Sequence, residues 1–452
     1  MPTRILIPSG VLCLGFDRAA LARGVAAKPD LIAIDGGSTD SGPWSLGAGQ
    51  SKYARSVTKS EWRELMLARA QAGVPLVIGT AGTCGADTCV DWMFDITCEL
   101  ATELGQSLRI ARLYSNQPSP RITDALAQGR LRPLTPAPDI NAEALGQMTN
   151  IVALAGAEQI QAALNTGADI IIAGRTTDTA IIAALPLMRG DHAGAAWHGA
   201  KIAECGALCS TNPTSGVIMV DFDADGFTVE PLADGATCTP HSVSAHMLYE
   251  NSDPFILYEP GGHLDVTETK YTALDARRTR ATGSKWVPGP YTVKLEGARA
   301  AGFQTTLLAV LRDAHYAANA QAWADKLHSF LDALIAKRMA LPTNSYTLDF
   351  RLIGVNATLG AMENRIGSPT EVGVLLIITA QTQALASEIG KLANPHLLHY
   401  PLTESEELPT FAFPYSPAQS DRGALYEFAL NHVLELDDPM SAFRLDVTEV
   451  TP

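Results

Sequence analysis

Four ionisable side chains in this sequence have the types that acid–base chemistry needs. Asp40, Asp178 and Glu204 carry carboxyl groups, and His246 carries an imidazole, the natural proton carrier near neutral pH. Each lies in a short stretch that contains glycine or hydroxyl groups. We therefore predict that these four residues are catalytic, with one accepting a proton and another delivering one.

The stretch around Asp178 has the clearest pattern. Residues 169–173 form a β-branched run without alternation, which is typical of a central parallel strand that is covered on both faces. Ligands bind at the carboxyl ends of such strands, so Arg175 could hold a substrate carboxylate, with Thr176 and Thr177 beside it. In the alternative interpretation, Asp178 caps the following helix and Arg175 pairs with it on the surface.

Similar strand-like runs alternate with helical stretches through the first part of the chain. They cover residues 4–7, 31–34, 75–78, 108–114, 150–156 and 169–173. This alternation predicts an α/β fold with a doubly wound, mostly parallel sheet. We assign this domain to residues 1–200, and a second α+β domain that completes the site to residues 201–452. The second domain contains an irregular proline-rich segment near residues 401–417.

Most of these strand-like runs end in glycine followed by a hydroxyl or carboxyl group. A single glycine can be a simple tight turn, but the repetition suggests one shared crevice. No nucleotide-binding glycine motif is present. The predicted substrate-binding residues in these turns are Gly36, Gly37, Ser38, Thr39, Gly79, Gly82 and Thr83.

The carboxylates Asp35, Asp40 and Asp178 could also share Mg²⁺, which needs few protein ligands. Capping of helices is the commoner use of such residues. The sequence around them has no metal-specific spacing, so the metal content stays open.

Polar residues of the second half could complete the site. His246 and Glu250 would share one face of a helix, and His246 could act as a proton donor or be packed in a domain interface. Replacing His246 by glutamine would then reduce turnover by about 10². The following turn supplies further predicted substrate-binding residues, Glu259, Gly261 and Gly262. Next to Glu204 lies Cys205, but buried cysteines are usually inert, so Glu204 is the favoured functional residue.

Composition limits the class of protein. The formal net charge of −15 argues against nucleic acid or an anionic membrane surface as the main partner. No signal-peptide pattern opens the chain and no run of about 18 apolar residues occurs, so we expect a cytoplasmic protein. Seven cysteines without a CxxC pair do not indicate a zinc ribbon or a disulfide framework.

Collinear motifs over essentially the whole chain resemble those of the acyclic terpene utilisation AtuA family. The motifs are GGSTDSGPWSLG at 36–47, GTAGTCGAD at 79–87, AGRTTDTA at 173–180, ECGAL at 204–208, AHMLYENSDP at 245–254, EPGG at 259–262, KLEGA at 294–298 and FPYSP at 413–417. The resemblance implies a cytoplasmic catabolic protein that is often encoded beside acyl-CoA enzymes. It also implies a small partner protein, which would here be a separate chain, because the family's frequent carboxy-terminal fusion is absent.

Three functions fit these observations. The leading hypothesis is a hydratase-type lyase that acts on an unsaturated carboxylate or acyl-CoA, with N–H donors of the glycine-rich turns stabilising an enolate. The second is a non-catalytic ligand-binding or scaffold subunit, and the third is a CoA-transferase that uses Glu204 or Glu259. We also expect a homo-oligomer.

Overall fold

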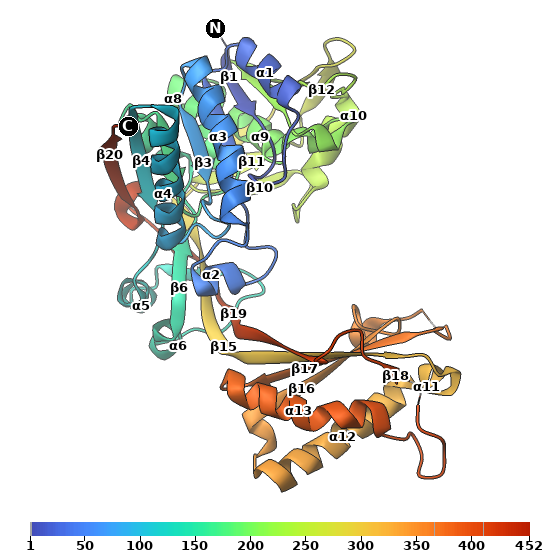
Figure 1. Ribbon diagram of the computed structural model, residues 1–452. Coiled ribbons are helices and arrows are strands. Elements are labelled where there is room, and N and C mark those ends of the chain that lie inside the picture. Colours follow the sequence, from blue (N-terminus) through green and yellow to red (C-terminus); the bar gives the residue numbers. More distant parts are fainter. Residues whose placement is uncertain (1, 366, 410) are drawn as a thin grey trace. The chain divides into compact units, whose positions relative to one another are not determined.

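The computed structural model describes residues 2–365, 367–409 and 411–452, and the chain forms two compact units (Figure 1). The first unit comprises Met1–Arg299 and Phe428–Pro452, and the second comprises Ala300–Glu427. The predicted boundary after residue 200 differs from this division. It would cut helix α9 (Ala193–Ala203), which is buried from Gly194 to its end. The first unit therefore continues for about another hundred residues and also takes in the carboxy-terminal strand.

Five parallel strands form the centre of the first unit. Their order is β1 (Thr3–Ile7), β2 (Leu31–Asp35), β3 (Leu76–Gly79), β7 (Ile170–Ala173) and β4 (Leu108–Tyr114). Antiparallel strands extend both edges of this sheet. They are β8 (Ile218–Phe222), β9 (Gly226–Pro231), β13 (Thr279–Thr282) and β12 (Lys270–Ala273) beyond β1, and β20 (Arg444–Val450) beyond β4. The sheet is thus parallel at its centre and antiparallel at its edges.

Helices cover both faces of this sheet, which confirms the doubly wound α/β fold. Along β1, Ile5 and Ile7 face one core and Leu6 faces the other. One core includes helices α7 (Ala157–Leu164), α8 (Ala180–Arg189) and α9, and the other includes α1 (Arg18–Ala26), α3 (Arg55–Ala72) and α4 (Asp87–Leu104). Burial on both faces is the reason that the parallel strands are apolar without alternation.

The strand order also sets the position of the crevice. Helices α1, α3 and α4 carry the chain outward from β1 to β4 on one face, and the return through β7 uses the other face. Strands β3 and β7 are neighbours whose following helices lie on opposite faces, which is the usual place for a ligand crevice. Thr80 and Arg175 follow these two strands.

One strand predicted for the parallel series lies elsewhere. Strand β6 (Met148–Ala153) pairs antiparallel with β15 (Thr292–Leu311), and Val152 is opposite Glu296. The apolar pattern of β6 led to the correct prediction of a strand. The strand with which β6 pairs is far away in the sequence. The pairing brings Glu296 to the carboxyl edge of the sheet. The same part of the unit contains α2 (Trp44–Ala48), α5 (Ser119–Ala127), β5 (Leu131–Pro133) and α6 (Ala142–Gly146).

The rest of the first unit consists of a hairpin, a small antiparallel sheet and a short helix. Strands β8 and β9 form a hairpin, and the Asp223 side chain accepts hydrogen bonds from the N–H groups of its turn. A small antiparallel sheet contains β10 (Ile256–Glu259), β11 (Gly262–Asp265) and β14 (Lys285–Pro288). Helix α10 (Pro240–Ala245) precedes it.

The second unit has α+β character. Strand β17 (Val372–Ala380) pairs with β16 (Tyr346–Ile353) and with the second part of β15, and its side chains alternate between buried and half-buried. Helices α12 (Ala320–Met339) and α13 (Gln383–His399) contribute to the core of this unit, with α11 (Ala314–Ala318). Strand β19 (Gln419–Glu435) crosses the boundary between the units.

The proline-rich segment at 401–417 has little regular structure. Its described residues contain the two-residue strand β18 (Phe411–Ala412), and residue 410 lies outside the described residues. Among the described helices of the whole chain, none is both long enough and apolar enough to cross a membrane.

Candidate active site

A cleft of about 570 Å³ lies at the carboxyl ends of β1 and β2. Three of the four predicted catalytic residues, Asp40, Asp178 and Glu204, line it, as does Asp35. The predicted residues Gly37 and Ser38 also contribute. Glu250, which was expected beside His246, also lines the cleft. The sequence did not identify other lining residues, which include Ser9, Gly10, Val11, Leu14, Gly15, Lys52, Tyr53, Leu208 and Tyr249.

Asp40 lies at the rim of this cleft. Its side chain is exposed, and Oδ2 accepts a hydrogen bond of 2.7 Å from the Ser38 hydroxyl. Asp40 also lines a side pocket of about 380 Å³, together with Thr39, Lys294 and Asn431. This carboxylate is therefore shared by two cavities and is open to water.

Asp178 follows β7, at the start of the segment that leads into α8. About 36% of its side chain is exposed, although protein surrounds it. Burial raises the pKa of Asp178, the nearby Arg175 partly offsets this rise, and Asp40 adds to it. Thr179 directly precedes α8, and no side chain caps the amino-terminal end of this helix. The alternative in which Asp178 caps α8 is therefore not what the structure shows.

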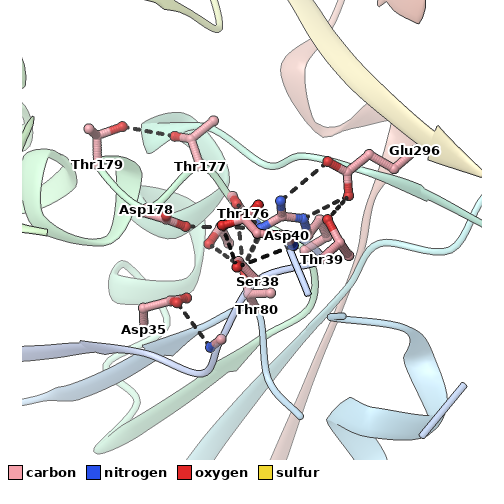
Figure 2. Close-up of polar contacts among 12 residues, drawn as sticks. Asp35, Ser38, Thr39, Asp40, Thr80, Thr176, Thr177, Asp178, Thr179 and Glu296 are labelled. Atoms are coloured by element: carbon pink, nitrogen blue, oxygen red, sulfur yellow. Dashed lines mark hydrogen bonds and ion pairs between the residues drawn. The ribbon is translucent and has the colours of Figure 1, made fainter. Parts of the chain in front are cut away.

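Arg175 is enclosed by partners from the loops after β3 and β7 and from strand β15. Figure 2 labels these partners, which are Thr80, Thr176, Asp178 and Glu296. Nε and Nη2 donate to the two carboxylate oxygens of Glu296 at 3.1 and 3.3 Å. Nη1 donates to the Thr80 hydroxyl at 3.2 Å and to the carbonyl of Thr176 at 3.4 Å, and it lies 4.0 Å from Asp178. Arg175 is not among the cleft-lining residues, so its guanidinium holds the loops together at this crevice.

Glu296 is the functional partner that the sequence analysis missed. Besides Arg175, it accepts hydrogen bonds from Thr39 at 3.1 Å and from Lys294 at 3.0 Å. Burial alone would raise its pKa, but Arg175 and Lys294 hold the pKa of Glu296 at about 2. A charged residue inside the apolar KLEGA strand was the available signal. Its meaning depended on the pairing of β6 with β15.

Glu204 forms the cleft wall at the carboxyl end of α9. Its Oε1 accepts a hydrogen bond of 2.5 Å from the Lys201 ammonium group one turn earlier. Burial raises the pKa of Glu204 to about 8, because it outweighs the opposing effect of Lys201, and Asp178 contributes to the rise. Glu204 therefore holds a proton near neutral pH. The pKa of the neighbouring Cys205 thiol is also raised, first by burial and then by Glu204, which favours the inert thiol.

Glu259 lies behind this wall, at the end of β10. The Thr179 hydroxyl donates a hydrogen bond to its Oε1, and Thr177 contacts Thr179 at 3.0 Å. Burial raises the pKa of Glu259 to about 7, and the two threonines oppose the rise. Gly261, with a φ of +84°, lies in the turn to β11, and Gly262 is the first residue of that strand and pairs with Glu259. These three residues are not among those that line the cleft.

His246 does not share a helical face with Glu250, which corrects the prediction. Helix α10 ends at Ala245, a short 3₁₀ turn covers His246–Leu248, and Glu250 has a φ of +52°. His246 is buried against Tyr249, and burial followed by Lys201 lowers the pKa of His246 to about 4. The imidazole is therefore neutral at pH 7. It is not among the cleft-lining residues, whereas Glu250 is.

The strand-end glycines pack the loops against one another. The Gly36 N–H donates to the carbonyl of Gly79 at 2.7 Å, and the Thr83 N–H donates to the carbonyl of Gly36 at 3.1 Å. A Cβ atom on Gly36 would lie 2.7 Å from the Thr80 carbonyl oxygen, and one on Gly79 would lie 2.5 Å from the Thr176 hydroxyl. Gly82, with a φ of +62°, packs on Cys89. Close approach of backbones therefore accounts for most of these glycines.

The predicted three-carboxylate magnesium site is not formed. Within residues 2–365, 367–409 and 411–452, no three His, Cys, Asp or Glu side chains are placed to hold one metal ion. Asp35 is the last residue of β2 and Asp40 follows the same strand, but the Asp40 side chain is engaged by Ser38 and that of Asp35 by the Gly37 N–H.

Comparison with known proteins adds one finding to this geometry. The protein-family model described as "acyclic terpene utilisation family protein AtuA" matches residues 46–402, which is more than half of the chain. The chain belongs to the AtuA family. No curated protein and no solved structure matches it.

Membership of the AtuA family associates the chain with the utilisation of acyclic terpenes. The matched region includes Arg175, Asp178 and Glu204, while Asp35 and Asp40 precede it. Of the family-like motifs, those at 36–47, 173–180, 204–208 and 245–254 contribute residues to the cleft. The motif at 79–87 packs behind them, where its glycines contact the other loops.

Proposed function

We propose that this AtuA-family protein is a hydro-lyase that adds water across a carbon–carbon double bond next to the carbonyl group of an acyl-CoA. The observation that carries the proposal is Glu204, a carboxyl group with a pKa of about 8 in the wall of a cleft. Such a group retains a proton at neutral pH and can deliver it to carbon. A raised pKa of a buried acid in a cleft is a typical feature of general acids.

The reaction needs a base as well as an acid. Asp40, at the exposed rim, accepts a proton from water while the water oxygen bonds to the β-carbon of the substrate. The π electrons move to the α-carbon and the carbonyl oxygen, and Glu204 then donates its proton to the α-carbon. Proton return from Asp40 through solvent restores Glu204, so the net change is the addition of one water molecule.

The walls of the cleft support an acyl substrate with a hydrocarbon chain. Leu14, Leu208, Tyr53 and Tyr249 line it, and Leu14 is 70% exposed. Exposed apolar side chains at the mouth of a cleft can be covered by a bound apolar chain. This fits the branched hydrocarbons that acyclic terpenes supply.

The charge of the cleft favours a thioester over a free carboxylate as the substrate. The cleft-lining residues include five carboxyl side chains and one lysine, Lys52, whose ammonium group donates to Ser41 at 3.0 Å. Arg175, which was expected to hold a substrate carboxylate, is engaged by Glu296. A neutral thioester carbonyl avoids repulsion by the cleft carboxyl groups.

The alternative functions have less support. A CoA-transferase needs an ionised glutamate as nucleophile, and the raised pKa of Glu204 opposes ionisation. Glu259 is not among the cleft-lining residues. A non-catalytic subunit predicts a pocket without perturbed carboxyl groups, whereas this cleft has several. A small partner chain and a homo-oligomer remain parts of the proposal.

The test is a hydration assay with branched 2-enoyl-CoA thioesters, starting with 3-methylcrotonyl-CoA, in ¹⁸O-labelled water. The expected product is a 3-hydroxyacyl-CoA that carries one ¹⁸O atom, identified by mass spectrometry. The assay is run with the purified chain alone and after addition of an extract that supplies a partner chain. Absence of labelled product in both, with every thioester of a chain-length series, would contradict the proposal.

A further inference from the structure

The proposed reaction requires a hydrogen-bond donor for the substrate carbonyl oxygen, on which negative charge develops. Three groups that could have supplied donors are engaged elsewhere. The Gly36 N–H donates to Gly79, the Gly37 N–H donates to Asp35, and the Arg175 guanidinium donates to Glu296, Thr80 and Thr176. The donor therefore has to be found among the other cleft-lining groups.

Asp35 has an unusual environment at the end of β2. It is only 7% exposed, yet it lines the cleft. Its Oδ2 accepts a hydrogen bond of 2.9 Å from the Gly37 N–H, whereas Oδ1 is buried and has no hydrogen-bond partner within the described residues. Buried polar atoms in native proteins are rarely left without a partner, because the loss of hydration costs about 1–3 kcal/mol. The free oxygen therefore points to a missing ligand.

The electrostatics around Asp35 indicate which form of the acid is present. Burial raises the pKa of Asp35 well above its usual range, Asp178 raises it further, and Arg175 and the Gly37 N–H oppose the rise. The N–H donor on Oδ2 requires that oxygen to be an acceptor. A proton therefore belongs on Oδ1, the oxygen without a partner. In Figure 2 the Asp35 carboxyl group lies on the same side of the view as Asp178, opposite Glu296.

We propose that Asp35 is a neutral carboxylic acid whose Oδ1–H group binds the carbonyl oxygen of the substrate in the cleft. Asp35 donates one hydrogen bond to the thioester oxygen and strengthens it as the enolate forms, without transferring the proton. The group that this subsite recognises is an uncharged carbonyl, such as that of a thioester, since a carboxylate there would be repelled by the nearby Asp178. This subsite goes beyond the proposed hydration in naming the group that recognises the carbonyl oxygen, and it rests on that proposal for the reaction.

The first experiment tests the neutral acid without any substrate. Infrared difference spectra at pH 7 compare the wild-type protein with Asp35→Asn, both labelled with ¹³C in the aspartate carboxyl groups. We expect the wild type to show the carbonyl stretch of a protonated carboxylic acid that the variant lacks. If the difference spectrum instead shows the bands of an ionised carboxylate, the proposal is overturned.

The second experiment uses 3-methylcrotonyl-CoA with ¹³C at the thioester carbonyl as the probe. Binding to the wild type should lower the carbonyl stretching frequency relative to free probe, Asp35→Ala should abolish this shift, and Asp35→Asn should keep part of it through its amide N–H. Turnover should fall by about 10² to 10³ in Asp35→Ala, the scale of a lost oxyanion donor, with a smaller change in KM. A protonated acid in the first experiment but an unshifted carbonyl in the second would mean that Asp35 donates to water or to Asp178, which would contradict the subsite.

The two proposals can fail separately. If Glu204→Gln loses turnover and a folded Asp35→Ala keeps it, hydration stands and the subsite is wrong. If the wild type has no hydratase activity, the proposed function fails, while the carbonyl shift of the bound probe still decides whether Asp35 recognises a carbonyl group. The isosteric Asp35→Asn keeps the experiment decisive if Asp35→Ala does not fold.

Discussion

Glu296 and Glu204 are two buried glutamates of the same unit, and each is paired with a basic residue. Glu296 accepts hydrogen bonds from Arg175, Lys294 and Thr39, and its pKa is about 2. Glu204 accepts one from Lys201, and its pKa is about 8, because burial outweighs that single partner and Asp178 lies nearby. The two residues are alike in type and in burial, so the number and charge of the partners decide which one is ionised.

This contrast separates a structural carboxylate from a chemical one. Glu296 is fully satisfied by its partners, which makes it a stable anion that holds Arg175 and the 36–40 loop. Glu204 is incompletely satisfied and faces a cleft, which leaves a proton available for transfer. Buried acids with shifted pKa values are common at functional sites. Catalysis uses acids whose burial is only partly offset by hydrogen bonds and opposite charges.

The largest effect is expected when the hydrogen-bonded cluster of Glu296 with Arg175, Lys294 and Thr39 is broken. Replacing Arg175 by Met leaves Glu296 buried without its main partner, so the free energy of unfolding should fall by about 3–5 kcal/mol. Urea denaturation monitored by circular dichroism measures this change. The matched control is Arg18→Met, which removes an exposed ion pair with Glu64 and should cost less than about 1 kcal/mol. A loss of similar size in both variants would mean that the Arg175 cluster does not stabilise the fold.

A smaller but still large effect is expected for Glu204→Gln. Glutamine keeps the size and a polar contact with Lys201 but cannot donate a proton to carbon, so turnover should fall by about 10² while the protein stays folded. Steady-state hydration kinetics measure it. The control Glu99→Gln removes a surface carboxylate of α4 that pairs with Arg55 and Lys59. Normal turnover of Glu204→Gln would exclude Glu204 as the acid.

The comparison also predicts how stability depends on pH. The pKa of Glu204 is about 8 in the folded protein and near 4.5 in the unfolded chain, so between these values the folded state binds more protons. The contribution of Glu204 to stability is therefore present below pH 4.5 and is lost as pH rises toward 8. Glu259, with a pKa of about 7, contributes in the same direction.

Denaturation at several pH values tests this sign. Glu204→Gln should be more stable relative to the wild type at pH 8 than at pH 5, by about 1–2 kcal/mol. Glu296→Gln should not show this gain at high pH, because its folded pKa of about 2 lies below the window. Identical pH profiles for wild type and Glu204→Gln would contradict the raised pKa.

The smallest effect is expected for His246. The sequence suggested a proton donor and a loss of about 10², but the structure buries a neutral imidazole with a pKa of about 4, outside the lining of the cleft. His246→Gln should therefore lower turnover by less than about tenfold, through small changes around Lys201. A hundredfold loss without any loss of stability would restore His246 to the mechanism beside Glu204.

The sequence by itself determined the doubly wound sheet and the position of several site residues. Uninterrupted β-branched runs can be stable only when both faces are buried, and parallel strands place their carboxyl ends together. Asp40 and Asp178 were therefore predicted at one edge without knowledge of any contact, and both line the cleft.

Only the tertiary structure decided the roles of these side chains. Arg175 and Glu296 are 121 residues apart in the sequence. They lie together because β6 is not part of the parallel sheet but pairs with β15. Local patterns contain no information about such a partner. The protonation of Asp35 and Glu204 depends on burial and on the summed charges of distant segments, which exist only after the chain has folded. The predicted helical face of His246 and Glu250 failed for the same reason, since the packing of this segment ended the helix one residue before His246.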